Sequence, residues 1–359
     1  MSKKIAIIIS PNYKDYAKKY LADCITSIRK QDYQGEMKIF LTDNLSTPES
    51  YNYLVKIAPE AELILNKTND GYAKGCNDSI KQAILQSFDY IAIFNIHTNL
   101  EVDCLREMIK VIESDKKIGA VQSRMMLYPR STGSGQAEKE LINSLGNITH
   151  FLGFGYCSGY REKWIEQTDE IKNIFYPSGS SFLVKREILE KVGLFDEEFW
   201  MYNEDQDLGW RIWLAGFRCV LASKAVLFNK YEFERSIKKY YWMDRNRIIA
   251  MEKNYHWLTL LLIAPACLVM EIGLIIFAIK GGWFKEKLRV YCYFLNPVKW
   301  IYLWQARQQT QKLRQVKDKE IAKMISGRIW YQEIDDVKLR LVNPVFNLYW
   351  RIVKILIRW

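Results

Sequence analysis

The sequence predicts an α/β domain with a mostly parallel sheet, followed by a helical region that associates with membranes. Short apolar runs at 5–10, 38–42 and 90–94 are typical of strands buried on both faces of a parallel sheet. Stretches with helical periodicity separate these runs, and such alternation is typical of parallel α/β sheets. Toward the C-terminus, long apolar stretches lie between lysines and arginines. We therefore expect an α/β domain over 1–255 and a helical region over 256–359.

The elements of the first domain follow one another in a regular order. We expect strand 5–10, helix 16–30, strands 38–42 and 62–65, a helix ending near 87, strand 90–94, strand 181–185, helix 187–192 and a helix beginning at 204. The stretch 131–159 is rich in glycine and serine and long for a connection. We interpret it as a mobile loop over a site, with a surface insertion as the alternative.

Composition narrows the class of protein and of partner. A hydrophobic fraction of 49% over 359 residues excludes a disordered chain, and a net charge of +11 favours an anionic partner. The basic residues after 230 alternate with tryptophan, tyrosine and apolar runs, a pattern that favours an anionic membrane surface and not nucleic acid. Seven cysteines without a CxxC pair indicate a reduced, cytosolic setting.

An acidic helix start is the most unusual local feature of the sequence. Glu204, Asp205 and Asp207 fall in one turn, with Asn203 at the expected N-cap. Three like charges in one turn repel each other, so the cluster indicates a cation, a ligand or proton transfer. The alternative is a solvated turn held by Arg211 and nearby lysines.

Four motifs stand at or near strand ends in a fixed order. They are LTDNLST (41–47), NDGYAKGCN (69–77), FNIHTNLEV (94–102), and PSGSSFLVKRE (177–187) together with FDEEFWMYNEDQDLGWR (195–211). In this order the chain resembles a family 2 glycosyltransferase of the GT-A fold over about residues 4–255. The less specific segment INSLGNITHFLGFGY is similar to rhamnosyltransferase-like members.

The resemblance implies a nucleotide site at the carboxyl edge of the sheet. Asp43 corresponds to the aspartate that binds the nucleotide base. The implied nucleotide contacts are Asn12, Asp43, Asp70, Gly71, Gly75, Asn77 and Asn95. Glycines allow close backbone approach and the following helix N-terminus favours phosphate, so the assignment is physically reasonable.

The same resemblance implies a catalytic role for the acidic turn. Asp205 corresponds to the general base, and Glu204 and Asp207 would tune or orient it. One carboxylate suffices to take the proton of an acceptor hydroxyl, and a single in-line displacement inverts the anomeric carbon. Neighbouring carboxylates raise the pKa of such a base.

The metal site departs from the family pattern at two positions. His97 stands where the family has the last aspartate of its metal motif, and Asn229 stands where it usually has a histidine. Because imidazole binds Mn²⁺ better than Mg²⁺, we expect a divalent ion, Mn²⁺ before Mg²⁺, at His97 and, more weakly, Asn229. The alternatives are a metal-independent enzyme that uses Lys230 or Arg235, and a weakened or inactive enzyme.

Two C-terminal segments suggest membrane contact. Residues 257–279 are long enough to span a bilayer, but Pro265, Glu271 and basic flanks on both sides favour a surface-lying or re-entrant hairpin. A true span and a soluble core helix are the alternatives. Residues 345–359 predict a basic amphipathic helix with Trp350 and Trp359 as interfacial anchors, or a helix docked on the body.

The combined prediction is an inverting glycosyltransferase on the cytoplasmic face of the inner membrane, peripheral or monotopic. Its donor would be a UDP- or dTDP-type sugar and its acceptor a polyprenyl-linked glycan in cell-surface polysaccharide synthesis. The alternative is a non-catalytic nucleotide-sugar-binding or scaffolding subunit.

Overall fold

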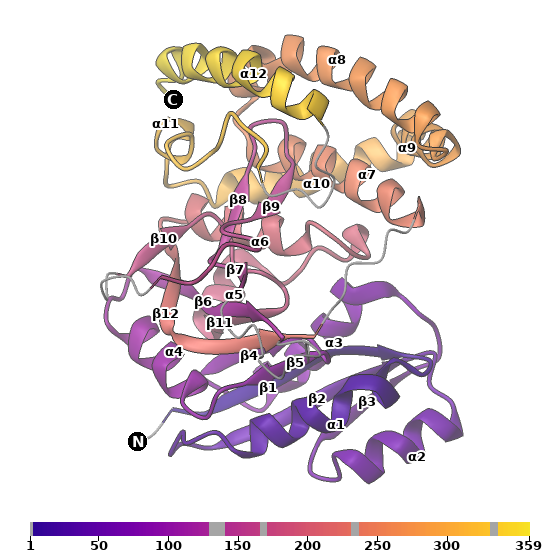
Figure 1. Cartoon of the computed structure of the whole chain (residues 1–359), viewed down its shortest axis with the longest axis vertical. Coiled ribbons are helices and arrows are strands. Elements are labelled where there is room, and N and C mark those ends of the chain that lie inside the picture. Colours follow the sequence, from indigo (N-terminus) through magenta and orange to yellow (C-terminus); the bar gives the residue numbers. More distant parts are fainter. Residues whose placement is uncertain (1–2, 129–140, 166–170, 231–236, 331–336) are drawn as a thin grey trace.

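A mixed sheet flanked by helices occupies one end of the molecule, and the C-terminal helices cover the other end (Figure 1). The computed structural model describes residues 3–128, 141–165, 171–230, 237–330 and 337–359. The chain begins beside the sheet and ends among the distant helices (Figure 1). The predicted α/β class is confirmed.

Within the described residues, one sheet contains ten strands, in the order β10-β12-β6-β11-β4-β1-β2-β3 with β5 and β7 at its side. The first four strands are β1 (Ile5–Tyr13), β2 (Met37–Asn44), β3 (Glu62–Asn66) and β4 (Tyr90–Phe94), and they run parallel. The others are β5 (Thr98–Leu100), β6 (Ile118–Leu127), β7 (Ile142–Ser144), β8 (Asn147–Thr149), β9 (Gly155–Cys157), β10 (Lys172–Ile174), β11 (Ser181–Lys185) and β12 (Arg218–Asn229). Strand β11 is antiparallel to β4 and β6, so the sheet is mixed.

Helices cover both faces of this sheet. In the first domain they are α1 (Tyr16–Arg29), α2 (Pro48–Ile57), α3 (Gly71–Leu85), α4 (Cys104–Glu113), α5 (Arg186–Val192), the 3₁₀ turn η1 (Glu197–Phe199) and α6 (Glu204–Leu214). The C-terminal helices are α7 (Ile237–Asn254), α8 (Trp257–Lys280), α9 (Phe284–Leu295), α10 (Pro297–Lys312), α11 (Asp318–Ile321) and α12 (Val337–Leu356).

The alternation of side chains along β1 creates two cores. Ile5, Ile7 and Ile9 point into one core with α1, α2 and α4, while Ala6 and Ile8 point into the other. The second core continues through α3 and α6 to α8 and α12. The helical region after residue 255 therefore shares a core with the sheet.

Part of the glycine- and serine-rich stretch is packed, contrary to the expected mobile loop. Residues 131–140 lie outside the described residues, but strands β7, β8 and β9 follow them. Phe151 and Leu152 are fully buried in the second core. The apolar residues within the stretch outweigh its glycines, so this half of it is part of the fold.

The predicted hairpin within 257–279 is wrong. This segment is one continuous helix, α8, and the chain turns only after Lys280. Pro265 lies inside the helix without ending it, since only one backbone hydrogen bond is lost there.

The predicted anchors of the C-terminal helix are wrong as well. Trp350 is buried and stacks on Phe151, with ring centroids 5.1 Å apart. Trp359 donates its indole N–H to the Thr259 hydroxyl at 2.9 Å. Both tryptophans hold α12 on the body, as the docked alternative predicted.

Helix α6 is fixed to α7 by a buried ion network around Asp207. Its carboxylate accepts from Arg211 Nε at 2.9 Å, from Lys253 Nζ at 3.0 Å and from Asn254 Nδ2 at 2.9 Å. The Asp207 side chain is fully buried. Removal of one partner from such a network leaves uncompensated buried charge, which is strongly destabilising.

We predict that Asp207→Ala lowers the free energy of unfolding by about 3–5 kcal/mol, because Arg211 and Lys253 lose their shared carboxylate. Chemical denaturation monitored by circular dichroism measures the loss. Glu49→Ala is the control, since the solvent-exposed Lys18–Glu49 pair is screened by water and should contribute little to stability. A loss for Asp207→Ala as small as that of the control would contradict the anchoring role.

Candidate functional site

The ends of the parallel strands bring the first predicted site residues to one edge of the sheet. Asn12 of β1 lies opposite Asp43 of β2 in the strand register, and Asn95 directly follows β4. Asp70 lies between β3 and α3 at the same edge. The expected gathering of these residues therefore occurs.

The Asp43 carboxylate makes its hydrogen bonds within the protein. Its carboxylate accepts from Asn12 Nδ2 at 2.7 Å and from the Ser50 hydroxyl at 2.6 Å, and the residue is fully buried. Asn12 in turn accepts from the backbone N–H of Ala17 at 2.9 Å. These bonds join β1, β2, α1 and α2, and they leave no Asp43 oxygen exposed to a nucleotide base.

The start of α3 is closed by Trp200. The Trp200 carbonyl accepts from the backbone N–H groups of Tyr72 at 2.7 Å and Ala73 at 3.2 Å. Gly71 has φ +90°, and a Cβ on it would lie 2.4 Å from the Trp200 oxygen. The glycine thus admits Trp200, and these two amide groups are not presented to a phosphate as expected.

The other residues of this motif also hold the fold together. A Cβ on Gly75 would lie 2.4 Å from Pro11, so the glycine permits close packing of α3 on β1. The Asn77 amide donates to the Phe195 carbonyl at 2.9 Å and to Glu197 at 3.0 Å. Asp70 differs, because its half-buried side chain accepts only from Thr68 among the described hydrogen bonds.

A strained backbone segment leads into the acidic turn. Trp200, Tyr202 and Asn203 have φ values of 60°, 71° and 65°, a left-handed region that non-glycine residues rarely adopt. Asn203 precedes α6 as predicted, but its side chain makes no backbone cap and donates instead to Gln206 Oε1 at 2.6 Å. Such strain persists only where the surroundings enforce it.

Asn246 of α7 enforces this conformation. Its buried Nδ2 lies within donor distance of three carbonyls, those of Phe199 at 2.9 Å, Met201 at 2.9 Å and Tyr202 at 2.7 Å. This role of Asn246 was not predicted from the sequence. The one local signal is the run of four polar residues DRNR (244–247), all of which are buried in α7.

Asp205 and Glu204 form a carboxylate pair with different environments. Asp205 accepts from the backbone N–H groups of Gly179 at 2.9 Å and Gln206 at 2.8 Å. Burial nevertheless raises the pKa of Asp205 to about 6. Burial, followed by the charge of Asp205, raises the pKa of Glu204 well above its usual range. Of the two carboxyl groups, Asp205 is thus the one whose charge the backbone amides stabilise, whereas its surroundings disfavour a charge on Glu204.

The loop 178–180 connects this pair to the end of β4. Gly179 donates to Asp205, and its carbonyl accepts from the Tyr72 hydroxyl at 2.6 Å. Ser180 contacts Asn95 twice, accepting its backbone N–H at 3.1 Å and its Nδ2 at 2.7 Å. Asp205 and Asn95 are therefore joined through this loop, whereas Asp207 points into the α6–α7 interface.

His97 is a neutral, nearly buried imidazole beside Asn95. Its Nδ1 is hydrogen-bonded to the Tyr16 hydroxyl at 2.9 Å, and its Nε2 lies 3.4 Å from Asn95 Nδ2. Burial lowers the pKa of His97 to about 4. The His97 carbonyl accepts from the backbone of Lys230 at 2.9 Å, so His97, in the turn just before β5, lies beside Asn229 at the end of β12, as one shared site would require.

The chemistry of these groups fits a divalent ion only in part. Among the described residues no group of three histidine, cysteine or acidic side chains could hold a metal. Asn95 Oδ1, however, is buried and has no hydrogen-bond partner in the described part of the chain. Asn229 instead donates to Asn143 Oδ1 at 3.2 Å, and Arg235 lies outside the described residues. An amide oxygen and an imidazole fit an ion that takes its other ligands from a diphosphate.

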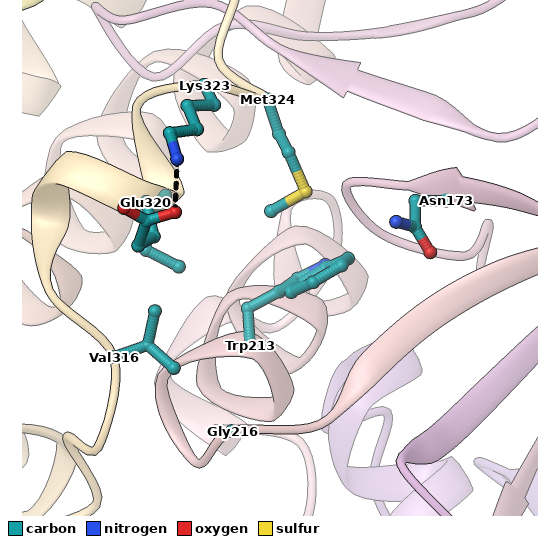
Figure 2. A pocket seen from close by; sticks show the side chains of 8 residues that line it. Asn173, Trp213, Gly216, Val316, Glu320, Lys323 and Met324 are labelled. Carbon is teal, nitrogen blue, oxygen red and sulfur yellow. Dashed lines mark hydrogen bonds and ion pairs between the residues drawn. The ribbon is translucent and has the colours of Figure 1, made fainter. Parts of the chain in front are cut away.

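A cavity of about 260 Å³ lies at the opposite end of α6. Trp213, Val316 and Met324 give it an apolar wall, and a Glu320–Lys323 ion pair borders it (Figure 2). It includes none of the predicted site residues and lies apart from the carboxylate pair.

A known protein family matches the N-terminal half of the chain. The sequence model of the family described as "Glycosyl transferase family 2" matches residues 7–193. An N-acetylglucosaminyl-diphospho-decaprenol L-rhamnosyltransferase of Mycobacterium tuberculosis is 26% identical over 210 residues, which cover 54% of this chain and 67% of that protein. A poly-beta-1,6-N-acetyl-D-glucosamine synthase of Staphylococcus aureus is 23% identical over 200 residues, which cover 55% of this chain and 43% of the synthase.

A solved structure supports the fold. The crystal structure of GalNAc-T7 with UDP, GalNAc and Mn²⁺ aligns with a TM-score of 0.52 at 15% identity, over 70% of this chain and 48% of that one. The family match covers more than half of the sequence, from β1 to the end of α5. The chain belongs to glycosyl transferase family 2 and is a glycosyltransferase with the GT-A fold.

Proposed function

We propose that this glycosyltransferase inverts the anomeric carbon as it moves a sugar from a UDP- or dTDP-sugar to a polyprenyl-linked glycan, with Asp205 as general base. The observation that carries the proposal is the carboxylate pair, in which Asp205 is ionised at neutral pH and has a pKa of about 6. The rhamnosyltransferase relative supports the acceptor class, since its name states a polyprenyl-diphosphate sugar. The pathway would be cell-surface polysaccharide synthesis at the cytoplasmic face of the membrane.

Proton transfer to Asp205 accompanies formation of the glycosidic bond. The acceptor oxygen attacks the anomeric carbon, its proton passes to the Asp205 carboxylate, and the bond between that carbon and the diphosphate oxygen breaks. Burial raises the pKa of Asp205 to about 6, and the hydrogen bonds from the Gly179 and Gln206 amides oppose that rise. A base with such a pKa can accept a proton near neutral pH. Burial and the charge of Asp205 raise the pKa of Glu204 and so disfavour a second charge beside the base.

A divalent ion would neutralise the diphosphate leaving group when bound. His97 and Asn95 are the residues that would hold it, and GalNAc-T7 was crystallised with Mn²⁺. Imidazole favours Mn²⁺ over Mg²⁺. In a metal-independent enzyme, Lys230, which pairs with Asp23 beside His97, would take the charge instead.

For the base, Asp205→Asn should lower kcat by about 10²–10⁴-fold, because the acceptor proton loses its carboxylate. Wild-type kcat/KM should fall below pH about 6, where Asp205 becomes protonated. A pH series with a nucleotide-sugar donor and lipid-linked acceptor measures both effects.

Glu204→Gln is the matched control for this prediction. Since burial and the charge of Asp205 disfavour the charged form of Glu204, a neutral amide is a close substitute, and the variant should retain transfer and keep the acid limb near pH 6. Loss of transfer in Glu204→Gln with retention in Asp205→Asn would exchange the two roles.

For the strained segment, Asn246→Ala should lower kcat about 10–100-fold, because the carbonyls of Phe199, Met201 and Tyr202 lose the donor that places the acidic turn. Asn343→Ala is the control, since this buried asparagine also bonds a backbone segment, at Ile329, by two 2.9 Å contacts. Both variants should lose similar stability. Equal kcat values for the two would assign Asn246 a merely structural role.

For the metal, EDTA should abolish transfer, and Mn²⁺ should restore it better than Mg²⁺. His97→Asp should reverse that preference, because a carboxylate suits Mg²⁺ better than an imidazole does. Initial rates after dialysis and metal addition test this prediction. Full wild-type activity in EDTA would favour the metal-independent alternative.

A further inference from the structure

Helices α8 and α12 each expose a stripe of large apolar side chains. On α8, Leu261, Leu268 and Ile272 are 61–68% exposed; on α12, Val345, Leu348 and Ile355 are 61–74% exposed. We call these six residues the apolar platform. α8 is also the helix in the described residues that is long and apolar enough to cross a membrane, and only 11% of its most apolar window is buried.

The two stripes face the same way, outward from the protein. α8 buries Ile263 and Ala266, and α12 buries Phe346 and Trp350, all in the same core. The helices lie side by side at the end of the molecule remote from the sheet (Figure 1), and the Tyr349 hydroxyl donates to the Leu262 carbonyl at 2.5 Å. Their opposite, exposed faces therefore form one surface.

The second half of α8 contacts α7 and α9, which argues against a span. The ring of Phe277, near the end of α8, contacts Tyr240, near the start of α7, with centroids 6.1 Å apart. Midway, Glu271 pairs with Arg247 of α7 and with Lys287 of α9. A bilayer-spanning α8 would draw these charged partners into hydrocarbon, which is unfavourable.

Basic side chains border the platform. Lys280, Lys285 and Arg289 are exposed at and beyond the end of α8, and Arg351 and Arg358 are exposed along α12 and just after it. A polar or cationic border around an apolar face is typical of helices that lie in the interface of an anionic membrane.

We propose that α8 and α12 lie in the plane of one anionic leaflet as a two-helix platform, with no segment of α8 crossing the bilayer. The platform specifies how the proposed glycosyltransferase would contact the membrane. It rests on the proposed function only for the polyprenyl-linked acceptor. The adjacent residues Asn246 and Arg247 of α7 hold the acidic turn and α8, respectively. The platform thereby fixes the position of Asp205 relative to the lipid surface, where a polyprenyl-linked glycan emerges.

Vesicle binding tests the platform. Two double variants, Leu268→Glu with Ile272→Glu and Leu348→Glu with Ile355→Glu, should each reduce partitioning of the full chain onto vesicles of 70% phosphatidylcholine and 30% phosphatidylglycerol at least tenfold. Leu85→Glu is the matched control, since this α3 residue is 76% exposed on the sheet domain. Wild-type partitioning of the α12 variant would overturn the two-helix platform.

Transfer to a detergent-free, water-soluble acceptor separates this test from that of catalysis. Platform variants that fold normally should keep this activity while losing transfer to vesicle-embedded acceptor. If wild-type protein binds vesicles through the platform and yet transfers no sugar, the proposed function fails while the platform stands.

Cysteine labelling tests the topology. In a Cys292→Ser background, Lys30→Cys in the sheet domain and Lys285→Cys beyond α8 should both react with an impermeant maleimide in sealed, inverted membrane vesicles. Both positions are exposed. Lys285 lies in the first turn of α9, directly after the turn that connects α8 to α9. Protection of Lys285→Cys until detergent is added would show a span and overturn the proposal.

Discussion

The polar interior face of α7 is the constraint on which the rest of the structure depends. Asn246 holds the strained carbonyls before α6, Lys253 and Asn254 hold Asp207, and Arg247 holds α8 through Glu271. A buried polar network is stable only when each member is satisfied, so these contacts fix α6, α7 and α8 in one arrangement. The acidic turn at the start of α6 and helix α8 are therefore parts of one rigid unit.

Within that unit, neighbouring acids of similar chemistry acquire different properties from their surroundings. Asp207 faces two cations and an amide, and it is an anchor. Asp205 faces two backbone amides in a partly desolvated position, and Glu204 faces burial beside a charge. Because Asp205 accepts from two backbone amides and Glu204 Oε2 has no hydrogen-bond partner among the described residues, a negative charge on this pair is better stabilised on Asp205. Position within the helix turn, and not residue type, decides which carboxylate is free to accept a proton.

The sequence predicted β1 to β4, β11 and the order of the motifs, because short buried strands and glycine turns leave local signals, but it did not predict the long strands β6 and β12. It predicted the roles of Asp43, Gly71, Gly75 and Asn77 less well. Those roles depend on Ser50, Trp200, Pro11 and Phe195, which approach only through tertiary packing. Asn246 and the anchoring roles of Trp350 and Trp359 were missed for the same reason: amphipathic periodicity gives the buried face of a helix but not the partner that covers it.

The strained backbone before α6 explains why the Trp200 carbonyl covers the first amide groups of α3. Trp200 reaches the start of α3 only because its own left-handed backbone directs its carbonyl there, and Gly71 leaves room for it. The carbonyls on either side of this residue are the ones that Asn246 holds. A donor that required the amides of Tyr72 and Ala73 would have to displace Trp200 and work against Asn246, and thus against the α7–α8 unit. Donor contacts that leave Trp200 in place, at Asp70, Asn95 and His97, require no such rearrangement, so they are the positions at which the geometry favours donor binding.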